Sequence, residues 1–144
     1  MIDVESRVSV KRPVRDVFRF LNDASNEPKW HTDVLEVKPA SSGPAAPGAT
    51  FSLRFKPMMG HSAGTMKILE VEQNRRLVSQ IDLGPMHPRV TYTFGSEGAM
   101  TTVSRRVQVE PPGMMKLMPF MMKRMVRKKG ETFLLNLKQN LEKE

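Results

Sequence analysis

The sequence predicts an α+β fold in which helices cover one face of an antiparallel sheet. Three observations lead to this prediction. Stretches with an apolar residue at every second position, typical of half-buried strands, follow one another through the middle of the chain. Turn sequences rich in Gly, Asn and Pro separate these stretches, as in an antiparallel meander. Helical periodicity appears only towards the two ends of the chain, which places the helices outside the meander.

The N-terminal region predicts one strand followed by a short amphipathic helix. Residues 4–10 alternate, with valines at most even positions and polar residues at odd positions. Pro13 stands where a helix can begin, because the first turn requires no proline N–H. Apolar residues then recur at helical spacing up to Leu21. A second helical turn is expected over residues 25–29, ending at Trp30.

Six further strands are expected before residue 110. Their approximate positions are 34–37, 51–55, 64–71, 77–83, 90–94 and 103–109. The turns between the later strands are expected at 57–60, 74–76, 84–85 and 96–98. Residues 39–48 are mostly Pro, Ala, Ser and Gly and therefore predict a loop. A bulge is expected shortly before Val71, where the alternation slips.

The C-terminal segment predicts a long helix with two apolar stripes. The first stripe comprises Met114, Leu117, Met118, Met121, Met122 and Met125. A proline inside a helix costs a hydrogen bond, so Pro119 is expected in the first turn. The second stripe, within residues 133–141, is rotated by about 120° from the first, at roughly 100° per residue. Because Gly130 lies between the stripes, we expect a bend there, or two helical pieces that face different neighbours.

Composition limits the possible functions. The formal net charge is +8, and the chain has no cysteine, which excludes disulfides, thiolate zinc sites and a cysteine nucleophile. No apolar stretch is long enough to span a bilayer, and no signal peptide is visible. We therefore expect one domain over residues 1–144, located in the cytoplasm. His31, His61 and His87 show no metal-ligand spacing and are expected on the surface or in loops, so neither a metal nor a cofactor is expected.

Several side chains are candidates to line a ligand cavity. Tyr92 and Arg105 lie on the apolar faces of their strands, where a phenol or guanidinium needs a partner, so either is a candidate to hold a ligand's carboxylate or carbonyl. Two alternatives for Arg105 stay open: a bulge that turns it to water, or an ion pair with Glu70. His61 is the best-placed histidine, because it opens a strand beside the 57–60 turn. The candidate ligand-binding residues are Trp30, Phe51, Phe55, His61, Met66, Tyr92, Arg105, Met118, Met122 and Met125.

The methionine stripe and the basic residues around it each allow two interpretations. Methionine stripes usually belong to a core, because Met fills irregular gaps, and the alternative is a pliable wall for an apolar ligand. Residues 116–129 contain lysines and arginines and no acidic residue. A solvated helix face is the simpler interpretation of this stretch, and transient contact with an anionic membrane is the alternative. Nucleic acid is not expected as a partner, because no known motif is present and aromatic residues make up only 6%.

The beginning of the chain resembles a known family. The residues that carry the resemblance are Ser6-x-Val8-x-Val10-x-x-Pro13-x-x-Asp16-Val17-Phe18-x-Phe20-Leu21-x-Asp23, followed by Trp30. They are similar to the opening of the START-like superfamily (SRPBCC), in particular its bacterial polyketide cyclase/dehydrase-type branch. Gly48 before a strand and the terminal Leu134-x-x-Leu137-Lys138-x-x-Leu141-Glu142 agree with it. The resemblance implies a helix-grip fold: a bent, seven-stranded antiparallel sheet around a long C-terminal helix, with two short helices and an elongated cavity between sheet and helix.

The residues and the resemblance together favour binding of a hydrophobic small molecule, such as a lipid, a polyketide or an aromatic compound, in that cavity. The first alternative is a polyketide cyclase/dehydratase-type enzyme. It requires at least two titratable groups that converge in the cavity, with Tyr92, Arg105 and His61 as candidates. The second alternative is membrane-surface association through the basic face of the C-terminal helix. Ligand selectivity is expected in the methionine half of that helix, and no oligomeric state is predicted.

Overall fold

The sheet dominates the structure, a computed structural model that describes residues 1–38, 45–58 and 60–143. Within these residues, seven antiparallel strands are ordered β1-β7-β6-β5-β4-β3-β2. Their bounds are β1 Ile2–Val10, β2 Val34–Lys38, β3 Thr50–Met58, β4 His61–Glu72, β5 Arg76–Asp82, β6 Arg89–Glu97 and β7 Met100–Val109. Consecutive strands from β2 to β7 are neighbours, and β1 closes the β7 edge. The expected meander is therefore confirmed.

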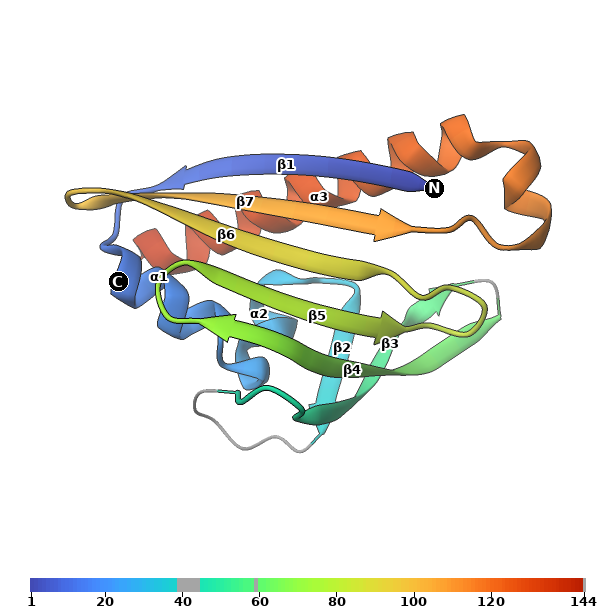
Figure 1. Ribbon diagram of the computed structural model, residues 1–144, viewed down its shortest axis with the longest axis horizontal. Helices are drawn as coiled ribbons and strands as arrows, with labels where there is room; N and C mark the ends of the chain where they lie inside the picture. The colour runs from blue at the N-terminus through green and yellow to red at the C-terminus, as the bar shows by residue number, and fades with distance from the viewer. Residues whose placement is uncertain (39–44, 59, 144) are drawn as a thin grey trace.

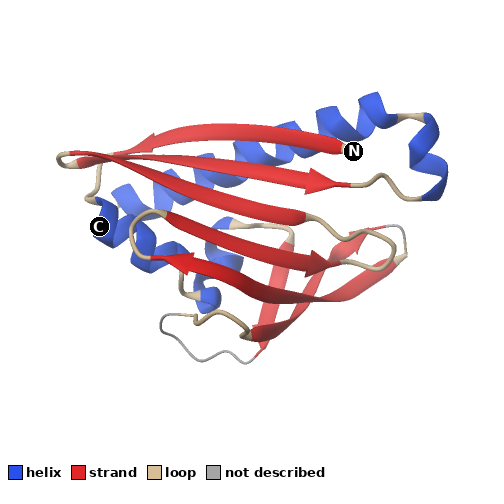
Figure 2. Ribbon diagram, in the orientation of Figure 1, coloured by secondary structure: helices blue, strands red, loops and turns tan. Residues whose placement is uncertain are grey.

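The helices lie outside the meander, as expected. Their bounds are α1 Val14–Leu21, η1 Ala24–Asn26, α2 Glu27–Trp30, η2 Gly113–Leu117 and α3 Pro119–Glu142. Figure 1 shows α3 running the length of the sheet along β1 and β7, with β2 and β3 inclined steeply to the other strands because the sheet is strongly bent. The end of α3 is tied to the β1–α1 connection, since the Glu142 carboxylate accepts a hydrogen bond from the Lys11 backbone N–H (2.8 Å). Figure 2 shows the helices gathered on one side of the sheet. None of the described helices is long and apolar enough to cross a membrane.

Two of the expected turns are shorter than predicted. Strand β3 continues through Pro57 to Met58, which pairs with His61, so the expected turn over residues 57–60 is wrong at its first two positions. Strand β6 likewise continues to Glu97, and the turn consists of Gly98 and the residue after it. The bulge before Val71 is confirmed by a register shift in β4. Most of the expected 39–48 loop lies outside the described residues.

Helix α3 is uninterrupted at Gly130, so the expectation of two separate helical pieces is wrong. The glycine permits close packing of the helix rather than ending it. A Cβ atom at this position would lie 3.1 Å from Ser6 Oγ and 3.2 Å from Arg105 Nη1. The two stripes do meet different surroundings along the bent sheet. Leu134 and Leu137 in the second stripe are fully buried in the main core. In the first stripe, Met122 and Met125 line a cavity, whereas Leu117, Met118 and Met121 are exposed.

The core is divided into two clusters. The larger cluster joins α1, α3 and strands β1, β6 and β7, and its most buried members include Val10, Val17, Trp30, Val103 and Leu137. The smaller cluster lies on β2, β3 and β4 and includes Val37, Phe51, Leu53, Phe55 and Met66. Side chains from both clusters line the cavity, which therefore separates them. The bend of the sheet creates this gap, since α3 covers only the β1–β7 side.

Candidate ligand cavity

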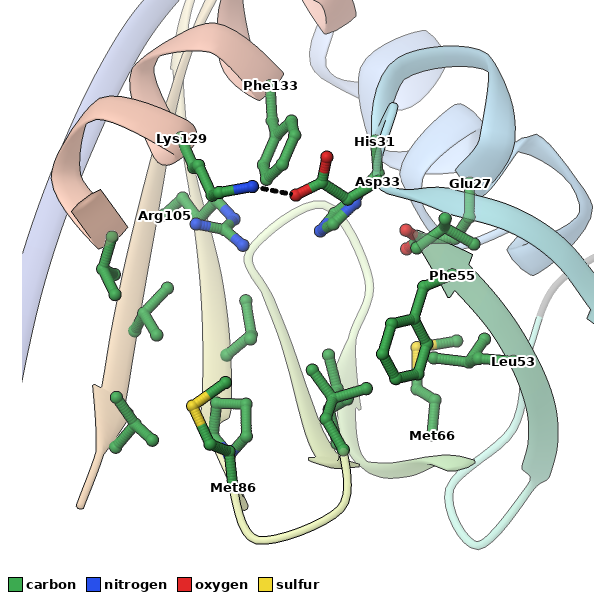
Figure 3. Close-up of a pocket in the computed structure, with 18 of the residues that line it drawn as sticks. Glu27, His31, Asp33, Leu53, Phe55, Met66, Met86, Arg105, Lys129 and Phe133 are labelled. Atoms are coloured by element: carbon green, nitrogen blue, oxygen red, sulfur yellow. Dashed lines mark hydrogen bonds and ion pairs between the residues drawn. The ribbon is translucent and has the colours of Figure 1, made fainter. Parts of the chain in front are cut away.

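A cavity of about 120 Å³ lies between the sheet and α3. Its apolar wall consists of Val34, Leu53, Phe55, Met66, Ile81, Leu83, Met86, Pro88, Val90, Val107, Val109, Met122, Met125, Val126 and Phe133. Its polar lining residues are Glu27, His31, Asp33, Arg105 and Lys129. Figure 3 shows these five side chains gathered at one end of the cavity, with apolar side chains filling the other end. We call this group of five the polar end.

The Arg105 guanidinium belongs to the polar end and is buried, with 7% of the residue exposed. Strand β7 places Arg105 opposite Ser6 of β1 and Tyr92 of β6 without any register shift. Its Nε–H donates a hydrogen bond to Tyr92 Oη (3.2 Å), and the guanidinium carbon lies 5.5 Å from the centre of the Phe133 ring. Both alternatives considered for Arg105 are wrong: no bulge turns it to water, and Glu70 pairs with Arg76. Among the described residues, no carboxylate forms an ion pair with this buried cation.

The Tyr92 hydroxyl holds Arg105 from the adjacent strand. Burial raises the pKa of Tyr92 to about 12, against the lowering effect of the Arg105 charge, so the phenol is protonated at neutral pH. The Trp30 ring meets the Tyr92 ring edge-on, with the centres 5.9 Å apart. Tyr92 lines a smaller cavity of about 30 Å³, which shares Glu27 and Met66 with the main one. It therefore lies behind the polar end and not in the main cavity wall.

The Glu27 carboxyl group faces Arg105 from the opposite side of the cavity (Figure 3). Side-chain amides of α3 fix α2, because Asn136 donates to the Trp30 carbonyl (3.3 Å) and Asn140 donates to the Lys29 carbonyl (3.0 Å). Burial raises the pKa of Glu27 to about 7, although the positive charge of Arg105 acts in the opposite direction. At neutral pH this carboxyl group is therefore divided between its acid and its carboxylate forms, as suits a proton donor and acceptor.

His31 and an ion pair complete the polar end. The His31 ring stacks on the Phe133 ring with the centres 4.0 Å apart. Burial and the charge of Arg105 lower the pKa of His31 to about 3, so the ring is neutral. Its Nδ1 atom is buried and has no hydrogen-bond partner among the described residues, which leaves it available to a ligand. Asp33 is engaged by Lys129 of α3, so its charge is already paired.

Half of the predicted binding residues line the cavity. These are Phe55, Met66, Arg105, Met122 and Met125. Trp30 and Tyr92 are buried directly behind the polar end, where their rings are in contact. Phe51 is buried in the smaller core cluster on β3. The structure therefore brings most of the predicted set to one region, from six different strands or helices.

Two predicted residues do not reach the cavity. His61 begins β4 and is exposed, with its ring against the Gly84 backbone in the β5–β6 connection. Met118 immediately precedes α3 and is 54% exposed. Met118 belongs to the first stripe only if the residues before Pro119 are α-helical, and α3 begins at Pro119. Among the described residues of the first stripe, Met122 and Met125 line the cavity, so the expectation of ligand selectivity in this half now concerns these two side chains.

The sequence analysis missed four of the five polar-end residues. Glu27, His31 and Asp33 lie in the short segment between α1 and β2, and neither helical nor strand periodicity indicates which way they face. Lys129 was assigned to the basic helix face, and its ion pair across the cavity was not foreseen. A usable signal was the presence of three titratable residues around Trp30. Among the described residues, no group of three or more His, Cys, Asp or Glu side chains is placed to hold a metal ion.

Comparisons with known proteins agree with this geometry. Residues 1–142 match the family model described as "Polyketide cyclase / dehydrase and lipid transport". No curated protein matches the sequence. A START superfamily protein from Mycobacterium smegmatis is 15% identical with a TM-score of 0.78, and the match covers 98% of this chain and 97% of that one.

Two solved structures from biosynthetic systems are also similar. DynU16, a protein of the dynemicin biosynthetic locus, is 21% identical with a TM-score of 0.74, and the match covers 99% of this chain and 48% of DynU16. The di-domain ARO/CYC protein BexL of the BE-7585A pathway is 17% identical with a TM-score of 0.73, and the match covers 99% of this chain and 47% of BexL. This chain therefore spans about half the length of either protein. At these identities the likeness shows the fold, which is the helix-grip fold.

Proposed function

This chain belongs to the polyketide cyclase/dehydrase and lipid transport family, and from this premise we propose that it binds a hydrophobic small molecule between the sheet and α3. One observation carries the proposal: the cavity is apolar at one end and holds a buried cation at the other. Apolar walls favour transfer of a hydrophobic molecule from water in proportion to the area buried. A lipid, a polyketide or an aromatic compound with an oxygen-bearing head fits this division.

The head of the ligand is assigned to Arg105. A buried charge without an ionic partner is costly, and the cost falls when an oxygen acceptor binds to it. The Nε–H of Arg105 is used by Tyr92, and the Nη groups remain for a ligand carboxylate, enolate or carbonyl. His31 Nδ1 supplies a second, neutral contact beside it. The apolar part of the ligand then extends towards Met86 and Met122.

The size of the cavity restricts the ligand. An engineered cavity of about 150 Å³ holds one benzene molecule, so a cavity of about 120 Å³ accepts roughly one ring or a short acyl segment without rearrangement. Larger ligands require movement of the wall. The methionines in the wall supply this movement, because the thioether side chain is unbranched and adapts its shape. They are Met66, Met86, Met122 and Met125.

Binding is tested by displacement of a neutral fluorescent probe, Nile red, with decanol and phenylbutanol, alongside native mass spectrometry of the purified protein. Met125→Trp fills the cavity from its half-buried rim and should weaken probe binding at least about tenfold, by analogy with overpacking of a core. Leu135→Trp is the matched control, because Leu135 is 50% exposed on the same helix. Equal binding by both variants would exclude the cavity as the binding site.

The place of the head group has its own test. Decanoate should bind more tightly than decanol to the wild-type protein, and Arg105→Met should remove this preference while Nile red still binds. Tyr92→Phe is the milder companion, since it removes one hydrogen bond and leaves the cation in place. If Arg105→Met keeps the preference for decanoate, the head lies elsewhere.

A second candidate function, a cyclase/dehydratase-type reaction, is favoured by the convergence of Glu27, His31 and Arg105 on one end of the cavity. In this proposal Glu27 removes a proton from a carbon next to a ligand carbonyl, and the enolate oxygen is stabilised by Arg105. The enolate carbon attacks a second carbonyl of the same molecule, forming a carbon–carbon bond, and the resulting alkoxide takes up a proton. Loss of water from the alcohol completes the reaction. Tyr92 is a positioning residue, because it acts through Arg105.

The first step can be measured without knowing the natural substrate. Wild-type protein should accelerate exchange of the α-hydrogens of phenylacetone for deuterium, followed by NMR. Glu27→Gln should reduce this acceleration at least about tenfold, because the variant lacks the proposed general base. Glu97→Gln, exposed at the end of β6, is the control. If wild-type protein and Glu27→Gln give the same exchange rate, the site binds without catalysing proton transfer.

A further inference from the structure

A cluster of exposed apolar side chains surrounds the beginning of α3. Leu117 and Phe120 are each 85% exposed, Met121 is 64% exposed and Met118 is 54% exposed. Single exposed apolar residues are ordinary, but four large ones in five consecutive positions make a patch that indicates an interaction site. Figure 1 shows η2 and the first turns of α3 projecting beyond the end of the sheet. We call these four side chains the apolar tip.

Positive charge surrounds the apolar tip. Its basic neighbours are Lys116, Lys123, Arg124, Arg127 and Lys128, which we call the basic collar. All five are exposed, and no acidic residue occurs between positions 114 and 130. Phe120 shares a surface depression with the four collar residues that follow it and with Glu131 at its far end in the sequence, so positive charge outnumbers negative charge there by four to one. Within the described residues, no ion pair within 4.0 Å neutralises the collar, so its charge is available to a partner.

We propose that the apolar tip and the basic collar form a docking site for an anionic phospholipid bilayer. Apolar side chains enter the boundary between headgroups and acyl chains, while lysines and arginines remain at the level of the headgroups. A second copy of the chain fits less well, because a symmetric contact would bring two basic collars together. The charge pattern therefore favours an anionic lipid surface over self-association.

The position of the site connects it with the cavity. Met121 points outwards at the tip, whereas the next residue, Met122, is 1% exposed and lines the cavity. A bilayer that holds the first turns of α3 therefore lies close to the methionine wall. A hydrophobic ligand can then pass between bilayer and cavity over a short path, without crossing bulk water. Docking itself does not depend on the identity of the ligand.

The test is sedimentation of the full chain with vesicles of phosphatidylcholine alone and of phosphatidylcholine mixed with phosphatidylserine. Wild-type protein should bind the anionic vesicles, less so at high salt, and should bind phosphatidylcholine weakly. Each basic residue near an anionic surface is worth about fivefold in affinity, so Lys123→Gln with Arg124→Gln should reduce partitioning at least about tenfold. Leu117→Ser with Phe120→Ser should reduce it by a similar factor, through loss of buried apolar area.

Matched controls separate docking from general effects of charge and apolar surface. Lys56→Gln with Lys67→Gln removes two exposed charges from β3 and β4, and Leu135→Ser removes an exposed apolar side chain from α3. Both should partition like the wild-type protein, and all variants should still bind Nile red. Equal binding to both vesicle types, or no binding to either, would overturn the proposal. So would light scattering that shows a dimer abolished by Phe120→Ser, since it would assign the tip to a second copy.

Discussion

Replacing Glu27 with glutamine tests the electrostatics of the polar end directly. Burial raises the pKa of this carboxyl group from 4.5 to about 7 in the folded protein, while the unfolded chain retains the ordinary value. Between about pH 4.5 and about pH 7 the folded state therefore holds a proton that the unfolded state has released. By linkage, this group makes the protein less stable as the pH rises through that window. The side-chain amide of the Glu27→Gln variant is neutral throughout and lacks this dependence.

The size of the effect follows from the same pKa values. At about 1.4 kcal/mol for each pH unit, the ionised Glu27 carboxylate costs up to about 3 kcal/mol above pH 7. Most of this cost accumulates between about pH 5 and about pH 8. The side chain is half-buried, so solvent screening makes this figure an upper limit. The free energy of unfolding of Glu27→Gln, relative to wild type, should rise by roughly 2 kcal/mol over this range.

Urea unfolding at the two pH values measures the difference, provided that the slopes agree between the two proteins. Glu97→Gln, which replaces an exposed carboxylate, should follow the wild-type pH profile. His31 does not disturb the comparison, because both proteins contain it. Its pKa is lowered to about 3, so it makes the protein less stable as the pH falls below about 6.5, the opposite direction to Glu27. A difference between Glu27→Gln and wild type that stays constant with pH would refute the assigned environment of Glu27.

Three further substitutions test the cavity wall, the ion pair and the helix contact. Met122→Ala should lower the free energy of unfolding by about 2 to 4 kcal/mol in urea titration, because Met122 is 1% exposed, and should preserve decanol binding in the enlarged cavity. Lys129→Met should lower the free energy of unfolding by about 1 kcal/mol, because it leaves the Asp33 carboxylate unpaired. The double variant Lys129→Met with Asp33→Asn should recover most of this loss, as a double-mutant cycle would measure. Gly130→Ala should change the melting temperature little, since the gain of about 1 kcal/mol in helix propensity is offset by crowding of Arg105, but should weaken decanoate binding more than Nile red binding.

The fold was largely predictable because its signals are local. Alternation with period two depends only on which face of a strand is buried, and it indicated most of the strands that the structure describes. Two helix starts could be predicted from prolines, since both Pro13 and Pro119 occupy positions that need no N–H donor. The expectation of a turn at Pro57 was wrong because of the tertiary surroundings of β3. Strand β2 begins at Val34, opposite Phe55, so β3 has no β2 partner beyond that point, and a proline there costs the sheet little.

The polar end was less predictable because it is assembled from distant segments. Arg105 was a candidate because a strand pattern places it on an apolar face, but its partner depended on the register of β6 with β7. Glu27 begins the short helix α2 and His31 follows it. Only tertiary contacts determine the direction of this helix, namely the amides of α3 that bind the α2 carbonyls. The phase of a helix is likewise informative only where the helix exists. It placed Met122 correctly in the wall and failed for Met118, which precedes the first turn.

The absence of a side chain at Gly130 both weakens the helix locally and permits close packing of α3 at the candidate site. The sequence position of Gly130 predicted a bend or two helical pieces, yet α3 continues through it. The missing Cβ lets α3 pass within van der Waals distance of Arg105 and Ser6. The helix and Tyr92 therefore leave Arg105 only 7% exposed. A cation confined in this way interacts with whatever faces it in the cavity, which is the Glu27 carboxyl group in the free protein and, in the complex that we propose, the ligand head. The proposed binding of a carboxylate ligand to Arg105 should therefore also raise the pKa of Glu27, because the ligand adds negative charge and screens the cation. Ligand binding and the pH dependence of stability should then be coupled through Arg105.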